Sequence, residues 1–420
     1  MSRPPSERPP RDVDVLIVGA GPAGLAAAAR LAAAGVARVE VLDREQHAGG
    51  VPRHCHHGGF GTWTHPLTGP AYARLVLDAA VRAGAVVRTG ITALDWAGPL
   101  SLDTVGPQGQ ETVRAAAVVL ATGARERPRA ARLVPGTRTG GVYTTGELQQ
   151  AVHLYRQRIG TRVVVVGAED VSYAAADTAR AAGAEVVAMV TELGRSQTTT
   201  ARAHTARLRH RVPLLTDTTV TELLGHGRLS GVRVRHRDGR SARLACDAVV
   251  FTGDFVPDHE LARRGGLVLD AGTRGPAVDG TLRTSRHGVF AVGGVLHPVE
   301  SAATATRDGA HVAAAVRELL AGTERPRTKL PLFVDPPLRW IAPNRVAPGD
   351  RHPYVLRTSE PLHRPVLHLV QDGRLLHREG LRRALPNRTL TLTARWTHLV
   401  DAGGGPVRVT LDGPRSSHSR

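Results

Sequence analysis

The stretch at residues 12–43, DVDVLIVGAGPAGLAAAARLAAAGVARVEVLD, constrains the fold more than any other part of the chain. It begins with an apolar, β-branched run at residues 13–18, which is typical of a strand buried on both faces. An Ala/Leu-rich segment then predicts a helix that ends near Gly35, and a second apolar run ends at Asp43. Between the first strand and the helix lie three glycines in GxGxxG spacing: Gly19, Gly21 and Gly24.

Each part of this strand–helix–strand unit suits the binding of a dinucleotide. Gly19 permits a tight turn, Gly21 lets the backbone approach a pyrophosphate, and Gly24 lets the helix pack closely on the strand. The helix N-terminus adds free N–H groups and positive potential for the phosphates. Asp43 follows Gly24 at roughly 20 positions and can accept both hydroxyls of a ribose. We therefore expect a dinucleotide here rather than an ordinary βαβ unit.

Composition limits the class of protein. The chain has 420 residues, enough for two or three domains with substantial cores. Its net charge of +18 comes almost entirely from scattered arginines, and only 3% of its residues are aromatic. Since few rings exist for bases to stack on, we expect no nucleic-acid partner. No apolar run reaches membrane-spanning length, and the segment before Asp12 is polar and Pro-rich, so we expect no membrane span and a cytoplasmic location.

Three later motifs follow the opening unit. Residues 118–128 read VVLATGARERP, residues 163–171 read VVVVGAEDV, and residues 284–294 read TSRHGVFAVGG. With the first glycine motif, they resemble two-domain flavoproteins of the pyridine nucleotide–disulfide oxidoreductase type over about residues 12–322. GGVPRHCHHGGFG, followed by LTGPAYAR, is similar to the hydrogen cyanide synthase B, opine oxidase A and dye-linked proline dehydrogenase α subunits.

This resemblance implies an α/β fold with two Rossmann-like domains, the second inserted in the first. The expected FAD-binding domain spans 12–150 and 254–322, and the expected NAD(P)-type domain spans 151–253. After a Pro-rich linker, alternating apolar and polar residues at 330–415 predict a small β-rich module, for docking, dimerisation or simple completion of the core. The resemblance implies FAD as cofactor, bound by these residues: Gly19, Gly21, Pro22, Ala23, Gly24, Asp43, Arg44, Gly49, Gly50, Ile91, Ala121, Thr122, Gly123, Gly293, Gly294, Glu300 and Ser301.

The second nucleotide motif is damaged. Gly167 begins it, but Glu169 stands where a glycine should approach the pyrophosphate, and Ser172 replaces the packing glycine. Two acids at the helix N-terminus would compete with and repel a phosphate, since two charges ~5 Å apart repel by ~1–3 kcal/mol at intermediate dielectric. Glu192, after the next strand, would discourage a 2′-phosphate, so NADP is less expected than NAD. The pattern favours an altered site over working NAD(P) binding.

The late motif also departs from the family pattern. Gly294 stands where the family has an aspartate that binds the ribityl region of the flavin, so we expect weaker but not absent FAD binding. Pro298 suits the first turn of the following helix, which places the helix N–H groups near residues 299–301. The resemblance implies that this positive helix end faces the flavin ring.

Two residues are candidates for acid–base work. The run His54-Cys55-His56-His57 suggests a metal site, but consecutive residues in an extended loop point in alternating directions and converge poorly on one ion, so we expect no metal. The only other cysteine is Cys246, so there is no CxxC pair for dithiol chemistry and no set of four cysteines for an iron–sulfur cluster. Cys55 and His54 could instead line the flavin as acid or base, or only cover it.

Three functions stay open. The first is an FAD-dependent dehydrogenase or oxidase that takes hydride from an amine or amino acid onto flavin N5, as one component of a larger complex or with another electron acceptor. The second is an NADH-dependent flavin reductase that passes electrons to a partner protein. The third is a non-catalytic component that only holds the flavin. A homodimer is a further partner hypothesis.

Overall fold

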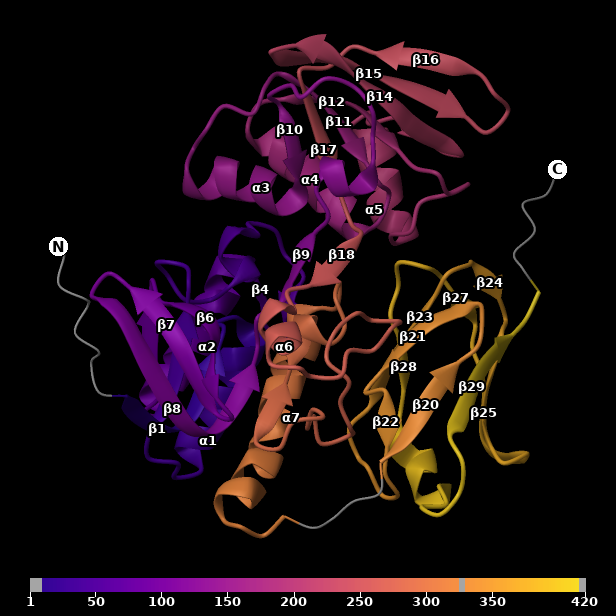
Figure 1. Cartoon of the computed structure of the whole chain (residues 1–420). Coiled ribbons are helices and arrows are strands. Elements are labelled where there is room, and N and C mark those ends of the chain that lie inside the picture. The colour runs from indigo at the N-terminus through magenta and orange to yellow at the C-terminus, as the bar shows by residue number, and fades with distance from the viewer. Residues whose placement is uncertain (1–9, 325–328, 415–420) are drawn as a thin grey trace. The chain divides into compact units, whose positions relative to one another are not determined.

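The computed structural model describes residues 10–324 and 329–414, which form two compact units. Unit 1 comprises residues 10–53, 60–124, 256–324 and 329–414, and unit 2 comprises residues 54–59 and 125–255. Figure 1 shows the elements of each unit along the chain. The expected Pro-rich linker falls largely at residues 325–328, outside the described residues.

Unit 1 contains a seven-stranded sheet of order β5-β2-β1-β8-β7-β6, with β19 also paired to β8. Strands β1, β2, β5 and β19 and the second half of β8 run parallel, whereas β6, β7 and the first half of β8 form an antiparallel meander. The strands are β1 (Arg11–Val18), β2 (Val39–Asp43), β5 (Val86–Thr89), β6 (Thr92–Gly98), β7 (Ser101–Gly106), β8 (Gly109–Leu120) and β19 (Val289–Ala291). A small hairpin, β3 (Phe60–Gly61) and β4 (Pro66–Leu67), lies apart from this sheet.

The helices of unit 1 are α1 (Pro22–Ala33), α2 (Gly69–Arg82), α6 (Glu260–Arg264) and α7 (Ala302–Leu320). The second half of β1 is buried, with Val15, Leu16 and Ile17 inaccessible to solvent. Helix α1 packs closely against α7 because both use small residues. A side chain at Gly309 would place its Cβ 2.0 Å from the carbonyl oxygen of Ala23.

Unit 2 contains a parallel sheet of order β10-β17-β11-β12-β13 and an antiparallel sheet of order β14-β15-β16. Its strands are β10 (Val142–Thr144), β11 (Arg162–Val166), β12 (Glu185–Val190), β13 (Leu214–Leu215), β14 (Thr218–His226), β15 (Arg228–His236), β16 (Ser241–Leu244) and β17 (Ala248–Phe251). Its helices are α3 (Thr145–Gln149), which continues as a π-helical turn, α4 (Asp170–Ala181) and α5 (Thr200–His204).

The chain enters and leaves unit 2 through two short strands that pair with each other, β9 (Ala124–Glu126) and β18 (Phe255–Pro257). The expected limit of the first domain at residue 150 differs from this division. Unit 2 includes residues 54–59, 125–150 and 254–255, all of which fall in the expected FAD-binding domain, and β10 pairs there with β17.

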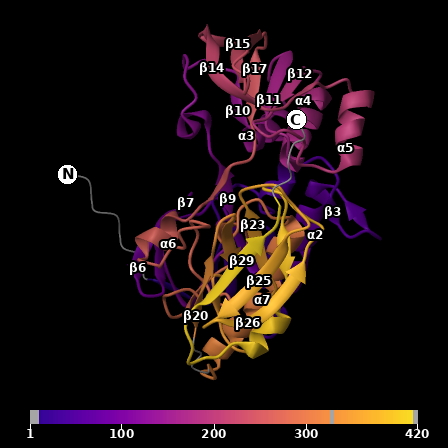
Figure 2. The ribbon, with the colours of Figure 1, turned by 90° about the vertical axis from the view of Figure 1, so that its right-hand side faces the viewer.

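The C-terminal β-module is part of unit 1 and has two main sheets, of order β22-β20-β29-β25-β26 and β21-β23-β28, with a small pair, β24 and β27. Figure 2 shows its larger sheet face on. Its core centres on Tyr354 and Trp396, whose ring centroids lie 5.4 Å apart. The strands are β20 (Leu330–Val334), β21 (Leu338–Ala342), β22 (Arg345–Val346), β23 (Tyr354–Thr358), β24 (Leu362–His363), β25 (Val366–Gln371), β26 (Arg374–Gly380), β27 (Arg383–Ala384), β28 (Leu390–Leu392) and β29 (Val407–Asp412).

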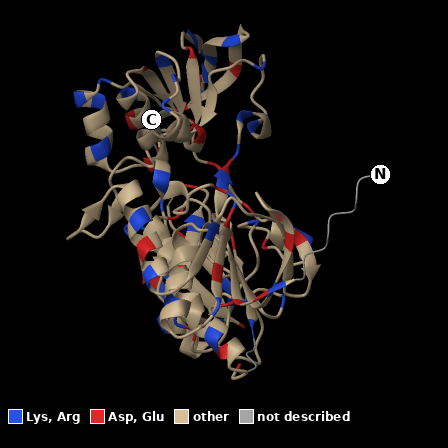
Figure 3. Ribbon diagram, turned by 90° about the vertical axis from the view of Figure 1, so that its left-hand side faces the viewer, with Lys and Arg blue, Asp and Glu red and all other residues tan. Residues whose placement is uncertain are grey.

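Two Rossmann-like parallel sheets and a β-rich module confirm the expected fold class. Figure 3 shows basic residues spread over the elements of both units, with fewer acidic residues scattered among them. None of the helices in the described part of the chain has the length and apolar character needed to cross a bilayer.

Candidate functional site

The candidate site of unit 1 lies at the carboxyl ends of its parallel strands, where open α/β sheets bind ligands. The glycine loop follows β1, the ribose acid ends β2, and the Ala121-Thr122-Gly123 motif follows β8. The Gly293-Gly294 motif follows β19, whose register with β8 places Ala291 opposite Leu120. Motifs far apart in the sequence therefore meet at one edge of one sheet.

At two positions of the first loop, the backbone lies so close to another backbone segment that only glycine fits. Gly19 has a left-handed φ of +112°, and a Cβ there would lie 2.3 Å from the carbonyl oxygen of Ala121. A Cβ at Gly24 would lie 1.9 Å from the carbonyl oxygen of Gly19. The first glycine thus fits the loop against the Ala121 motif, and the third lets α1 pack on the loop, as the spacing predicts.

Gly21 leaves the end of α1 open. It is the N-cap, in an extended conformation, and the first turn of the helix holds no acidic residue. A Cβ added at Gly21 would meet only the Cα of Gly50, at 4.0 Å. Helix N–H groups and the helix dipole at this uncapped end suit a phosphate. The glycine doublet at residues 49–50 passes directly beside it, as the sequence predicts.

Asp43, the last residue of β2, forms hydrogen bonds with the same loop. One carboxylate oxygen accepts a 2.7 Å hydrogen bond from the N–H of Ala20, and the other accepts one of 2.8 Å from the N–H of Glu45. The Ile91 N–H donates to the Asp43 carbonyl at 2.9 Å. These bonds bring Asp43 and Ile91 together, as expected for the adenosine end of a dinucleotide.

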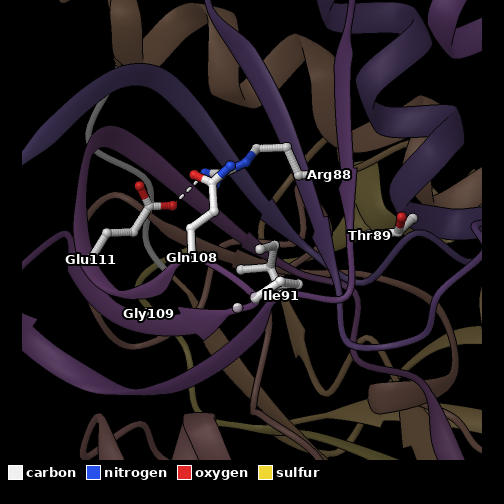
Figure 4. A pocket seen from close by; sticks show the side chains of 8 residues that line it. Arg88, Thr89, Ile91, Gln108, Gly109 and Glu111 are labelled. Carbon is white, nitrogen blue, oxygen red and sulfur yellow. Dashed lines mark hydrogen bonds and ion pairs between the residues drawn. The ribbon is translucent and has the colours of Figure 1, made fainter.

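A pocket of about 290 Å³ lies next to Ile91, between β5 and the turn that joins β7 to β8. Thr89, which lines it, is the register partner of Asp43. Figure 4 shows the side chains of Arg88 and Glu111 meeting at the pocket wall, where they form an ion pair. The pocket therefore adjoins the sheet edge that carries the ribose acid.

The Ala121-Thr122-Gly123 motif is held through Asp258. The hydroxyl of Thr122 donates to the Asp258 carbonyl at 2.6 Å, and the Asp258 N–H donates to the Gly123 carbonyl at 2.9 Å. The Asp258 carboxylate also pairs with Arg44 at 3.3 Å. Arg44 is thereby engaged inside unit 1, next to the ribose acid that it follows.

The Gly293-Gly294 motif packs against the other two loops. A Cβ at Gly293 would lie 2.7 Å from the Cβ of Ala23, and one at Gly294 would lie 3.4 Å from Gly123. The structure thus brings together the expected cofactor residues from the first loop, the Thr122 motif and the late motif.

The prediction that Pro298 begins the following helix is wrong. Helix α7 begins at Ala302, after the N-cap Ser301, whose hydroxyl accepts from the Thr304 N–H at 3.2 Å. Val299 stands before it with a left-handed φ of +82°, which stops the helix from extending further back. Ser301 is therefore at the positive helix end, whereas the carboxylate of Glu300 binds Arg357 and Thr389.

In unit 2, the second glycine loop repeats the backbone of the first. Gly167 has a φ of +134°, and Glu169 is the extended N-cap of α4, at the position that Gly21 has on α1. The Glu169 carboxylate folds back into the loop, where it accepts a 3.0 Å hydrogen bond from the N–H of Ala168. This carboxylate takes up the loop N–H whose counterpart in the first loop, that of Ala20, binds Asp43, and it places a negative charge beside the N-terminus of α4.

The register of the second unit also differs from the sequence-based prediction. Val18 pairs with Leu42 just before Asp43, and Val166 pairs with Val190 just before Thr191. Thr191, and not Glu192, is the structural counterpart of the ribose acid. It is buried, and its hydroxyl accepts from the Leu193 N–H at 3.3 Å. The spacing could have shown this, because Asp43 and Thr191 each follow a helix-ending glycine, Gly35 or Gly183, by the same interval.

The candidate acid–base residues His54 and Cys55 are both buried. The Cys55 thiol donates to the side-chain oxygen of Gln149 at 3.4 Å. Burial, and then the nearby Glu126 carboxylate, raise the pKa of the Cys55 thiol to about 12. Cys55 therefore stays a thiol at neutral pH, which argues against a thiolate role. Among the residues that the structure describes, no three His, Cys, Asp or Glu side chains are arranged so that they could hold a metal ion.

Comparison with known proteins decides the family. The model of the pyridine nucleotide-disulphide oxidoreductase family matches residues 13–309. The chain belongs to this family. This confirms the resemblance found in the motifs and makes the protein an FAD-dependent oxidoreductase.

Relatives in the family include the alpha chain of sarcosine oxidase from Corynebacterium sp. (strain P-1), 30% identical over 74% of this chain and 33% of that protein. The opine oxidase A component of Rhizobium meliloti is 29% identical over 67% of this chain and 58% of that protein. The chain thus spans a third to just over half of the length of these relatives. The crystal structure of T. acidophilum thioredoxin reductase is 25% identical, with a TM-score of 0.62 over 74% of this chain and 99% of that one.

The residues of unit 1 fit the FAD of this family. The open N-cap at Gly21, the glycine doublet beside it and the carboxylate of Asp43 form a cradle for a pyrophosphate and a ribose. In the second loop, the N-cap position that Gly21 has on α1 is taken by Glu169, whose carboxylate accepts from the Ala168 N–H.

Glu126 is a residue of the Ala-Thr-Gly-containing segment that sequence reasoning missed. Its carboxylate accepts from the N–H of Gly146 at 2.9 Å and from the N–H of Gly253 at 3.1 Å. Burial nevertheless raises the pKa of Glu126 to about 7, since its ionised form is poorly solvated. Glu126 lies within the segment at residues 118–128, but the resemblance assigns a role only to its Ala-Thr-Gly turn. No sequence pattern therefore singled out this glutamate.

This pKa predicts a pH-dependent stability difference between the parent and a Glu126→Gln variant. Between the ordinary pKa of 4.5 and about 7, the folded parent holds a proton that the unfolded chain releases, so its stability falls as pH rises. The glutamine does not titrate. Subtracting the parent's free energy of unfolding from the variant's should give a value that rises by about 2–3 kcal/mol between about pH 5 and pH 8. Urea denaturation at a series of pH values measures it, and a difference independent of pH would contradict the buried acid.

Proposed function

We propose that this protein is an FAD-dependent dehydrogenase or oxidase that oxidises an amine or amino acid and passes the electrons to a partner protein or another acceptor. The observation that carries this proposal is the Glu169 carboxylate bound in the second nucleotide loop. If the electrons do not come from a nicotinamide nucleotide, an amine or amino acid substrate is the donor that we propose.

Three features of unit 2 argue against NAD(P)H as the electron donor. Glu169 takes up the Ala168 N–H and places a negative charge at the helix end, and Asp170 adds a second charge in the first turn. A phosphate there would meet repulsion of ~1–3 kcal/mol from each nearby acid at intermediate dielectric. The position of the ribose acid holds Thr191, whose neutral hydroxyl accepts from the Leu193 N–H.

Cysteine content argues against a disulfide substrate. Thioredoxin reductase provides the fold match, but this chain has only Cys55 and Cys246, which are both free and buried. Burial raises the pKa of each thiol, to about 12 and about 11. Without a pair of reactive thiols, exchange with a protein disulfide has no starting nucleophile in this chain.

The relatives support an amine substrate. Sarcosine and opines, which appear in their names, are N-substituted amino acids. Both relatives are named as parts of multi-component oxidases, and this chain covers only part of each. We therefore include a second oxidoreductase component, or another acceptor, in the proposal.

Bound FAD would supply the redox chemistry, by accepting hydride from the substrate at flavin N5. The chain's own residues hold and orient the cofactor. Gly21 and the α1 N-terminus would receive the pyrophosphate, Asp43 the ribose, and the α7 N-terminus capped by Ser301 would supply positive potential at the ring.

The proposal is tested by mixing the FAD-loaded protein, without oxygen, with a panel of amines, amino acids and N-substituted amino acids while visible flavin absorbance is recorded. At least one compound of this class should bleach the flavin at a rate that depends on its concentration. If no compound bleaches the flavin of this protein alone, but the same compounds do so once a copurified partner protein is added, this protein and its partner form the catalytic site together. Bleaching only by non-amine substrates would contradict the proposal.

A further inference from the structure

The segment at residues 293–301 joins the late flavin motif to the N-terminus of α7, and the C-terminal β-module holds it at both ends. We propose that the module is a positioning device for this segment and thereby fixes how unit 1 holds FAD. The inference rests on FAD binding by the family and is independent of the proposed amine substrate.

The first attachment is at Glu300. Its carboxylate forms an ion pair with Arg357 of β23 and accepts a hydrogen bond from the hydroxyl of Thr389. Only 3% of the Glu300 side chain and 5% of the Arg357 side chain are exposed. The Arg357 guanidinium also lies over the ring of Trp340, 5.6 Å from its centroid, so β21 holds it in place before it reaches Glu300.

The second attachment is at Asp308 of α7. Its carboxylate accepts from the N–H of Gly293 at 3.2 Å and contacts Nε2 of His297 at 2.6 Å. The other oxygen lies 3.0 Å from Nε2 of His352, which belongs to the C-terminal β-module. The rings of His352 and His311 are stacked, with centroids 4.3 Å apart. One buried carboxylate therefore joins the module to the backbone of the flavin motif.

The Glu300–Arg357 and Asp308–His297 contacts are ion pairs rather than neutral packing contacts. Burial alone would raise the pKa of Asp308, but the two imidazoles hold it well below its usual range. Burial alone would lower the pKa of His297, but the Asp308 carboxylate raises it. A buried pair stabilises a fold little after its desolvation cost, whereas its geometry is strongly directional. Because both sets of pairs reach the segment at residues 293–301, they indicate that the module positions this segment rather than only completing the core.

The backbone between the two attachments is strained. Val299 has a φ of +82°, which is unfavourable for a β-branched residue, and it lies between His297 and Glu300. Such strain persists only where the surroundings fix it, and it concentrates at functional sites. The segment also lacks the family's aspartate at Gly294, so part of its geometry must come from elsewhere. Asp308 and Glu300 provide it through the module.

The test uses the full-length FAD-loaded protein and the variant Arg357→Met, which keeps most of the stem but removes the charge. FAD affinity should fall by about fivefold or more, and the visible circular dichroism of the bound flavin should change. Arg357→Lys should restore part of both. The matched control is Arg408→Met, because Arg408 pairs with Asp335 inside the module at 2.7 Å and should leave both unchanged.

A folded Arg357→Met protein whose FAD affinity stays within about twofold of the parent, with the same visible spectrum, would overturn the proposal. If this variant does not fold, Thr389→Val decides, since it removes only one hydrogen bond to Glu300 from an exposed residue. A changed flavin spectrum then supports the positioning role, and an unchanged one overturns it. Neither readout needs a substrate, so failure here leaves the proposed amine oxidation untouched.

Discussion

A Gly21→Glu variant is expected to fold normally but to lose its FAD. The backbone at Gly21 is extended, so it accepts any residue, and a Cβ there meets only Gly50 at 4.0 Å. The new carboxylate would place at the N-terminus of α1 the negative charge that Glu169 places at α4, where it would oppose the pyrophosphate and compete with Asp43 for the Ala20 N–H. We expect FAD affinity to fall by about 100-fold or more, which corresponds to about 3 kcal/mol. Flavin content after gel filtration and titration of the apoprotein with FAD measure the loss.

Two controls separate the loss of a binding site from a general effect. Gly21→Ala adds a Cβ without a charge and should reduce FAD affinity much less than the glutamate does. Gly380→Glu makes the same substitution at an exposed glycine of the C-terminal β-module with nothing within 4 Å, and should keep its flavin. A yellow Gly21→Glu protein with the parent's FAD affinity would show that the cofactor does not use this loop.

The reciprocal change, Glu169→Gly, is expected to open the second loop to nicotinamide nucleotides. It removes the carboxylate that binds the Ala168 N–H and returns the N-cap of α4 to the residue found at α1. We expect the affinity for NADH to rise by at least about tenfold, equivalent to about 1.4 kcal/mol, in line with the repulsion from one nearby charge. Equilibrium dialysis against NADH, with the parent measured beside it, gives the two affinities.

Asp170→Asn is the matched control for this experiment. It removes one negative charge from the neighbouring position but leaves the Glu169 carboxylate in the loop. A gain seen only in Glu169→Gly would locate the obstruction in the occupied N–H group, and an equal gain in both variants would assign it to charge alone. If the parent already binds NADH tightly and Glu169→Gly adds nothing, the loop accepts a nucleotide despite its glutamate.

The first nucleotide site could be predicted from sequence because its determinants are local. Gly24 is fixed by its contact with Gly19 inside one strand–helix unit, and Gly19 makes the left-handed turn between β1 and α1. The spacing to Asp43 follows from a helix of ordinary length. The glycine doublet Gly49-Gly50 could also be predicted from sequence, because it follows soon after the strand–helix–strand unit on which it packs. Local geometry of this kind leaves a clear signature in one chain.

The features that sequence reasoning missed depend on tertiary partners. The start of α7 is set by the left-handed Val299 and by the Ser301 cap, which together outweigh the preference of Pro298 for a first helical turn. The attachment of Glu300 depends on Arg357 of a strand more than fifty residues away, a partner that no local pattern specifies. The assignment of Thr191 in place of Glu192 differs from these two, because the strand register agrees with a spacing from Gly183 that the sequence already holds.

The direct test of the central claim, that the first loop serves FAD and Glu169 closes the second, is an anaerobic titration of the FAD-loaded parent protein with NADH and NADPH. Visible flavin absorbance reports reduction, and dithionite added at the end sets the fully reduced value. The account predicts that neither nucleotide bleaches the flavin beyond a slow drift, while dithionite reduces it completely. Rapid bleaching by one equivalent of either nucleotide would contradict it.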